Sequence, residues 1–256
     1  MKRIVLSLLA LAFTAGGAVA ADLAARPYTK APAMAAPVYS WTGCYVGGNI
    51  GYGWAPTRWT DNSLEFTSHN VDGVVGGGQV GCDYQSGKWV FGIQGMFDAA
   101  NMKGRGVNLF LDPGGRVIDE SKFSWLATLT GRLGYTIQPA TLLYVKGGAA
   151  WARANFKECC QPTVIISDTI GFLLDGAADT TRSGWTIGAG LEHIFAPNWS
   201  AFIEYDYIGL GRQTVTFSPI NGAPGPFNYQ IDQNIQTVLV GINYRFGSGG
   251  PVVAKY

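Results

Sequence analysis

Charged residues are scarce in this sequence, at 14% of 256 residues, and histidine occurs only twice. Without Lys2 and Arg3 the formal net charge falls from +1 to −1, so the chain has no basic field for nucleic acid. Beyond residue 20, no apolar run reaches the ~20 residues that a transmembrane helix needs. Histidine and cysteine are nowhere grouped at metal-ligand spacing, and we expect no cofactor.

The first residues have the pattern of an export signal. Basic Lys2 and Arg3 precede an apolar run at 4–13, and small residues follow up to Ala20, where a signal peptidase would cut. We therefore interpret 1–20 as a Sec signal peptide. The Ala- and Pro-rich stretch 21–40 is predicted to be a flexible periplasmic leader. The folded domain is predicted at 41–246, followed by a C-terminal tail at 247–256.

From residue 41 onward, apolar side chains recur at every second position. Trp199, Ile203 and Tyr205, for example, share one face of a strand, whereas Glu204 and Asp206 lie on the other. Glycine is abundant, with 36 residues, and eases the coiling of a tightly curved sheet. This period predicts eight strands, at about 42–54, 73–85, 89–101, 123–137, 141–155, 184–195, 199–211 and 233–246.

The connections between these segments are sorted by length. Three are tight turns, at 86–88, 138–140 and 196–198. They alternate with long polar stretches at 55–72, 102–122, 156–183 and 212–232. This layout over an even strand count is typical of bacterial outer-membrane barrels. Because hydrocarbon offers no partner for backbone groups, such a sheet has to close on itself. The predicted fold is all-β: an eight-stranded antiparallel up-and-down transmembrane β-barrel, in the outer membrane of a Gram-negative cell.

Large aromatic residues gather at both ends of the apolar face, which we place towards lipid. Tryptophan and tyrosine favour the membrane interface because each combines an apolar ring with a hydrogen-bonding group. The predicted girdle on the long-loop side contains Trp54, Trp125, Trp151 and Trp185. The girdle on the short-turn side contains Tyr84, Trp89, Tyr135, Trp199 and Tyr244.

The same alternation turns charged side chains into the barrel. An isolated charge in a narrow lumen costs several kcal/mol, so these groups have to be paired or hydrated. We predict a polar plug of ion pairs and trapped water, with a gated pore whose pairs rearrange as the alternative. The predicted lumen network is Asp83, Asp98, Arg132, Lys146, Glu192, Glu204, Asp206 and Arg245.

Four cysteines in an oxidising compartment are expected to pair. Cys44 and Cys82 lie on neighbouring strands, on the outward face and at the same end. They are candidates for a cross-strand disulfide if the register brings them together. Cys159 and Cys160 are adjacent in the third long stretch and could form a vicinal ring or link two chains.

An enzyme would need a nucleophile beside a base. His69 has Ser68, Asp61, Glu65 and Asp72 nearby in sequence, which makes a lipid or peptide hydrolase an alternative. Polar loops create such groupings by chance, and we expect no catalytic residue and no enzymatic activity.

Several motifs resemble one known family. The run 41–54 (WTGCYVGGNIGYGW) is similar to the opening of small opacity-type outer-membrane porin-family proteins, which are themselves similar to the transmembrane barrel of OmpA. The runs 144–150, 188–192 and 204–207 resemble later strands of that family, and 240–246 resembles its last strand. The resemblance implies a surface protein that supports envelope integrity. Some relatives are weak pores, adhesins or haem binders, so a small, low-conductance diffusion pore is the second interpretation.

The resemblance also implies partners. These are outer-membrane lipid and lipopolysaccharide, the barrel-assembly machinery, and host or environmental ligands that meet the loops. The assembly machinery commonly reads a terminal aromatic residue, and here either Phe246 or Tyr256 could serve.

Overall fold

The computed structural model describes residues 39–61, 64–107, 118–159, 165–166, 169–170, 176–219 and 226–246. The predicted signal peptide, nearly all of the leader, the tail with Tyr256, and Cys160 lie outside the described residues. Among the described residues, no helix has the length and hydropathy that a membrane crossing requires.

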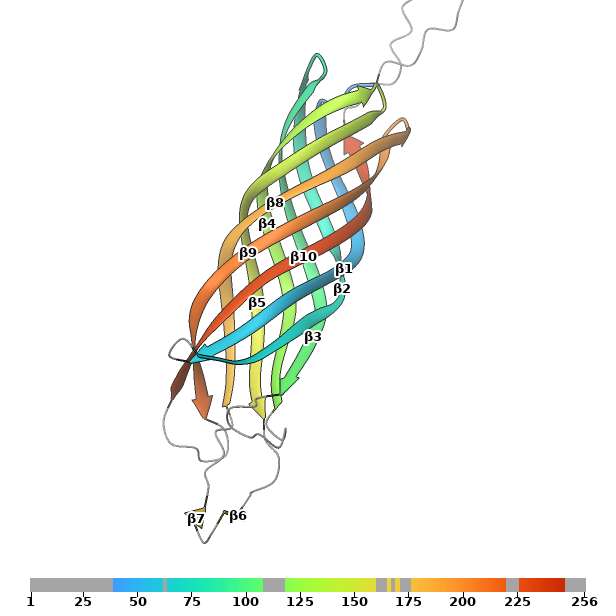
Figure 1. Cartoon of the computed structure of the whole chain (residues 1–256). Coiled ribbons are helices and arrows are strands. Elements are labelled where there is room, and N and C mark those ends of the chain that lie inside the picture. Colours follow the sequence, from blue (N-terminus) through green and yellow to red (C-terminus); the bar gives the residue numbers. More distant parts are fainter. Residues whose placement is uncertain are drawn as a thin grey trace, which may run out of the picture. The chain divides into compact units, whose positions relative to one another are not determined.

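Eight long antiparallel strands close into a barrel (Figure 1). Around its wall the order is β1, β10, β9, β8, β5, β4, β3 and β2. Two short strands, β6 (Ile165–Ile166) and β7 (Thr169–Ile170), pair only with each other among the described strands. The strands of the barrel are β1 (Gly43–Asp61), β2 (Leu64–Ser86), β3 (Trp89–Val107), β4 (Ile118–Gln138), β5 (Thr141–Cys159), β8 (Gly176–Ala196), β9 (Trp199–Pro219) and β10 (Phe227–Phe246).

The predicted fold class and the three tight turns are confirmed. At the first turn Gly87 has φ +60°, a left-handed conformation that glycine adopts without steric cost. The barrel closes between its first and last strands, from the pair Cys44 and Phe246 to the pair Thr60 and Gln230. Because every long strand has a neighbour on both sides, the wall has no open edge.

The strands are much longer than predicted, and the prediction of four long loops was wrong in extent. A membrane crossing takes about 9–11 residues, whereas these strands have 19–23. Most of 55–72 and all of 212–219 belong to strands. About half of each strand therefore continues beyond the length that a bilayer requires.

The physical reason is that the amphipathic pattern inverts along each strand. On β10, Val240 and Ile242 are exposed while Asn243 is buried, as expected for a wall in lipid. Further along the same strand, Ile231 is fully buried and Gln230 is exposed. Polar residues on the outer face of this second half made the stretch resemble a loop.

Candidate functional site

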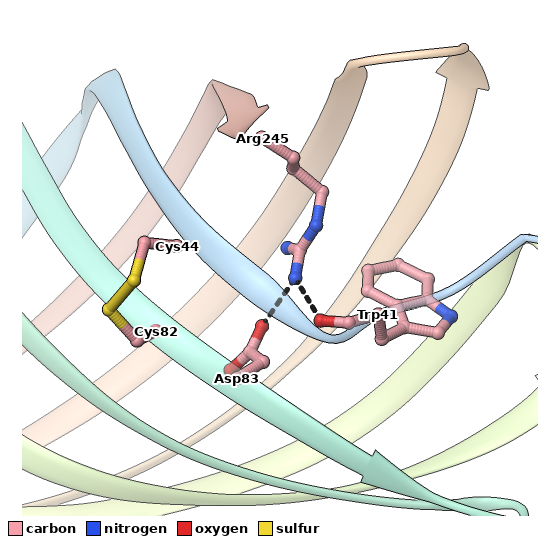
Figure 2. Close-up of a disulfide and its surroundings, with 5 residues drawn as sticks. All are labelled: Trp41, Cys44, Cys82, Asp83 and Arg245. Atoms are coloured by element: carbon pink, nitrogen blue, oxygen red, sulfur yellow. Dashed lines mark hydrogen bonds and ion pairs between the residues drawn. A yellow bond between two sulfur atoms is a disulfide. The ribbon is translucent and has the colours of Figure 1, made fainter. Parts of the chain in front are cut away.

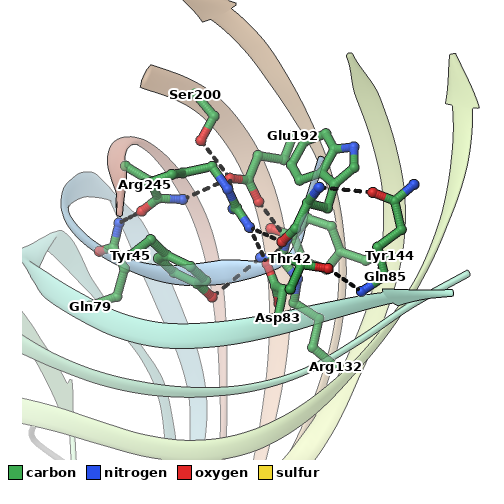
Figure 3. Close-up of polar contacts among 12 residues, drawn as sticks. Thr42, Tyr45, Gln79, Asp83, Gln85, Arg132, Tyr144, Glu192, Ser200 and Arg245 are labelled. Carbon is green, nitrogen blue, oxygen red and sulfur yellow. Dashed lines mark hydrogen bonds and ion pairs between the residues drawn. The ribbon is translucent and has the colours of Figure 1, made fainter. Parts of the chain in front are cut away.

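All eight predicted lumen charges lie inside the barrel, each with 5% or less of its surface exposed. Four of them form one cluster, the charged layer: Asp83, Arg132, Glu192 and Arg245. Arg132 lies 2.6 Å from Glu192 and 3.4 Å from Asp83. Arg245 lies 2.8 Å from Asp83 and 3.2 Å from Glu192. Two cations and two carboxylates thus alternate in a closed, formally neutral group (Figure 3).

The charged layer is held by neutral partners from the surrounding strands. Ser200 donates a hydrogen bond of 2.6 Å to Glu192, and the amide of Asn243 donates another of 3.0 Å. The guanidinium of Arg132 lies 4.2 Å from the ring centre of Tyr144, within the range of a cation–π contact. These contacts give Glu192 two further hydrogen bonds and place an aromatic ring against the guanidinium of Arg132.

A second group lies next to the charged layer. The ammonium of Lys146 is 2.6 Å from Glu204 and 3.1 Å from Asp206, and the hydroxyl of Tyr144 donates to Glu204 at 2.8 Å. Asp98 accepts a bond of 2.9 Å from the amide of Asn49. Since Tyr144 contacts both Arg132 and Glu204, the two groups form one continuous polar network.

Trp41 was not among the predicted site residues, yet it packs inside the periplasmic end. It is fully buried and lies against Val90 and Leu142. Its indole donates to the carbonyl of Pro139 at 3.2 Å, and its own carbonyl accepts from Arg245 at 2.7 Å. Trp41, which precedes β1, therefore covers the charged layer on its periplasmic side.

The other half of the lumen is filled mainly by apolar side chains, which corrects the prediction of a polar filling throughout. Trp59, Phe156, Phe217 and Tyr229, from β1, β5, β9 and β10, meet there and form what we call the aromatic layer. The ring centre of Trp59 lies 5.7 Å from Phe156, 5.3 Å from Phe217 and 6.0 Å from Tyr229. The sequence signal was the alternation of apolar Tyr229 and Ile231 with polar Gln230 and Asp232, at the end of the stretch 212–232 that was interpreted as a loop.

His69 points into the lumen beside the aromatic layer, with its ring centre 6.4 Å from that of Trp59. Its Nε2 is 3.0 Å from the hydroxyl of Ser121, a partner that sequence proximity did not suggest. Ser68 and Asp72 lie on the opposite, exposed face, and the side chains of Asp61 and Glu65 are outside the described residues. Of the sequence neighbours of His69, the two whose side chains are described therefore do not join it in a catalytic group.

Asp119 occupies the same part of the interior and is fully buried. Burial raises the pKa of its carboxyl to about 7, moderated by a hydrogen bond with Thr67. Burial also lowers the pKa of His69 to about 4, so its ring is neutral at pH 7. Among the described residues, no three carboxylate, histidine or cysteine side chains gather to hold a metal ion.

Cys44 and Cys82 form a disulfide, with their Cα atoms 3.9 Å apart on paired positions of β1 and β2 (Figure 2). The bond lies outside the wall, and the next residue, Asp83, turns inward to Arg245. The side chain of Cys159 and the whole of Cys160 are not described, so their state stays a prediction.

The disulfide gives a simple expectation for the purified protein. Digestion with trypsin without reductant should yield one species that joins peptide 31–58 to peptide 59–88. After reduction the barrel should still migrate differently on a gel before and after boiling, because hydrogen-bonded ladders hold both strands independently of the sulfur atoms. Free alkylation of both thiols in the folded, unreduced protein would contradict the assignment.

The predicted girdle residues lie on the outer face, and most of their rings contact another aromatic ring. Trp89 and Tyr135 meet at 5.2 Å between ring centres, as do Trp199 and Tyr244. At the other level, Trp185 lies 5.4 Å from Tyr207. Phe246 ends β10 with 52% of its surface exposed. The aliphatic band between the two levels exposes Val80, Ile93, Leu129, Val145, Ile187, Ile203 and Ile242.

The exposed apolar belt surrounds a closed wall, and the network of buried charges lies inside that wall. The sequence profile of the outer membrane protein beta-barrel domain matches residues 6–246. This chain belongs to that family. The protein is therefore an outer-membrane β-barrel of a Gram-negative bacterium, and the exposed belt is its lipid-facing surface.

Two curated relatives of this outer-membrane barrel are proteins of Brucella. The 31 kDa outer-membrane immunogenic protein of Brucella melitensis is 29% identical over 259 residues, which cover 96% of this chain and 100% of that protein. The 25 kDa outer-membrane immunogenic protein of Brucella abortus is 26% identical over 243 residues, covering 95% and 97%. The structure of OprG from Pseudomonas aeruginosa shares the fold, with a TM-score of 0.50 and 10% identity over 80% of this chain and 96% of that one.

Proposed function

We propose that this protein is a structural barrel with a closed lumen, which supports the envelope. It presents to the outside a long part with a polar outer face, which we call the extension: the parts of the strands that lie beyond the girdle of Trp54, Trp125, Trp151 and Trp185. The observation that carries the proposal is that two layers of side chains fill the lumen at different heights. The charged layer lies at the periplasmic level and the aromatic layer at the level of the extension. Each is built from side chains that are almost fully buried.

A small diffusion pore is the alternative, and two features disfavour it. Water-filled passage would require the charged layer to separate, which leaves Arg132 and Arg245 without their carboxylate partners. It would also require the rings around Trp59 to move apart at a different height. A rearrangement of ion pairs alone leaves the apolar half of the lumen filled.

Planar-bilayer recording of the refolded mature protein tests this proposal. At neutral pH we expect no stable open steps, either from the wild type or from the Trp59→Ala variant. The variant is a sharp comparison because it thins the aromatic layer while the charged layer stays intact. Stable steps in the wild type would refute the closed barrel, whereas steps only in the variant would assign the seal to the aromatic layer alone.

A hydrolase is also disfavoured. Ser121 and His69 are within hydrogen-bond distance, but their exposed fractions are 1% and 8%, so neither lipid nor peptide reaches them. The pair is better explained as polar packing beside the aromatic layer. The Brucella relatives carry names that state location and immunogenicity and no reaction.

The extension is the part that meets the surroundings. Its outer face is polar, for example at Arg58, Asn70 and Thr216, which suits contact with water and with host or environmental ligands. Assembly in the membrane is proposed to use Phe246, whose exposed ring follows Tyr244 on the last strand. Tyr256 remains the alternative signal, and it lies outside the described residues.

Antibodies raised against the folded barrel are expected to label intact cells, because residues 118–124 of β4 and 176–184 of β8 stand beyond the girdle residues Trp125 and Trp185. The same antibodies absorbed with unfolded protein should retain most of this labelling, since the epitopes are formed by neighbouring strands. Labelling that appears only after the outer membrane is disrupted would contradict the outward orientation of the extension.

A further inference from the structure

Basic side chains are concentrated on one side of the outer wall, just beyond the girdle. Lys103 and Arg105 lie on β3, Lys122 on β4, and Arg153 and Lys157 on β5, all with exposed side chains. On the opposite wall, Thr181 and Thr214 are neutral, and two exposed arginines, Arg58 and Arg212, flank Asp232 in the β1–β10 and β9–β10 ladders.

The basic side chains surround a hollow of about 670 Å³. Its lining includes Lys103, Arg105, Lys122 and Lys157, together with polar groups of Asn70, Asp72 and Asn155. Cations beside amides and carboxylates are the mixture that a phosphorylated sugar requires: ammonium groups for phosphates, and amide and carboxylate groups for hydroxyls.

The lining of the hollow carries four positive charges, on Lys103, Arg105, Lys122 and Lys157, and two negative charges, on Asp72 and Glu120. Asp72 faces Lys103 in the β2–β3 ladder, and Glu120 faces Lys157 in the β4–β5 ladder. Lys122 has no carboxylate at its facing positions, because it lies between Lys103 and Asn155, and like charges at facing positions are destabilising. Arg105 pairs with Glu120, and Arg153 lies 4.0 Å from Asp179. The ion pairs among the described residues do not involve Lys103, Lys122 or Lys157. An anion between them would relieve the repulsion.

The height of the hollow identifies where that anion comes from. Lys122 is three residues beyond Trp125 on β4, and Arg153 is the next outward residue after Trp151 on β5. At about 3.3 Å per residue, the ammonium groups begin within roughly 10 Å of the girdle along a tilted strand. This is the layer of the outer-leaflet headgroups, directly above the apolar belt.

We propose that this hollow binds the phosphorylated glucosamine headgroup of lipopolysaccharide, with Lys103, Lys122 and Lys157 as the phosphate-binding residues. The acyl chains of the same molecule then lie along the apolar wall below, over Phe97, which stacks on Trp125 at 5.8 Å between ring centres. The binding does not depend on whether the lumen conducts, so it is tested separately from the closed-barrel proposal.

The test uses the mature barrel in phosphatidylcholine nanodiscs, titrated with bisphosphorylated lipid A and followed by native mass spectrometry. A triple variant, K103Q/K122Q/K157Q, removes three positive charges from the hollow. The matched control, R58Q/R212Q/K88Q, removes three from the opposite wall and the periplasmic turn. Heat-modifiable migration on a gel verifies that each variant is folded.

We expect the hollow variant to bind lipid A at least about tenfold more weakly, and the control less than about twofold, because charge-assisted contacts are lost only in the first. Binding by the wild type should weaken as salt is raised. Equal losses in both variants would overturn the proposal, since net charge alone would then explain the binding. Equal affinity of the wild type for dephosphorylated lipid A, phosphatidylglycerol or inorganic phosphate would also overturn it.

Discussion

Replacing Glu192 with alanine is expected to lower the free energy of unfolding by about 3–5 kcal/mol. Glu192 is fully buried and accepts from Arg132 at 2.6 Å and Arg245 at 3.2 Å. Without it, two buried guanidinium groups share the single carboxylate of Asp83. The measurement is urea unfolding of the barrel in lipid vesicles, followed by tryptophan fluorescence and extrapolated to zero denaturant.

A matched control is Glu120→Ala, which removes the same side chain from the outer wall. Its side chain is 35% exposed and pairs with Arg105, so the cost should be below about 1 kcal/mol. A second variant isolates the charge effect: adding Arg132→Met to Glu192→Ala removes the surplus cation and leaves Arg245 and Asp83 as a pair. This double variant should recover part of the loss. If Glu192→Ala costs no more than Glu120→Ala, pairing in the charged layer does not stabilise the barrel.

The architecture was predictable because it depends on a local property. The period of two, the three tight turns and the solvation of the backbone in hydrocarbon together require a closed antiparallel wall. The same period also places Arg132 and Glu192 inside without knowledge of their neighbours. Which charges pair was not predictable, since the two lie 60 positions apart and meet only through the stagger of the strands.

The extension escaped prediction for a physical reason. A strand in lipid is apolar outside and polar inside, and the same strand in water is the reverse. The pattern of an apolar outer face identifies Val240 and Ile242 as strand residues. Tyr229 and Ile231 continue the same period of two, but they are apolar residues on the inner face, so their segment was interpreted as a loop. Trp41 was missed because its partner Pro139 is 98 positions away, in a turn whose position in space depends on closure of the barrel.

The last expected result concerns pH and the two titrating groups beside the aromatic layer. Both lie in the extension, outside the bilayer. Asp119 faces Gly106 in the β3–β4 ladder, and a side chain at Gly106 would meet His69 Nδ1 at 2.7 Å and Thr67 Oγ1 at 2.6 Å. Asp119, Thr67 and His69 thus surround one glycine, and substitutions at either titrating group report on the same small region.

The two groups affect stability with opposite signs. The pKa of Asp119 is about 7 in the folded barrel and about 4 in an unfolded chain. Between these values only the folded state keeps the proton, so stability falls as pH rises through this range. The pKa of His69 is about 4 when folded and about 6.5 when unfolded. Between these values only the unfolded state holds the proton, so stability rises with pH.

In the wild type the two slopes should nearly cancel between about pH 4 and 6.5, and single variants should reveal them. Asp119→Asn is expected to become more stable as pH rises from 4.5 to 6.5, and His69→Gln less stable as pH rises from 4.5 to 7. Each slope should approach about 1.4 kcal/mol per pH unit, to a total of about 3 kcal/mol. The double variant should be flat again. The measurement is the free energy of unfolding at four pH values. If both single variants show the same pH dependence as the wild type, neither group is desolvated by the aromatic layer.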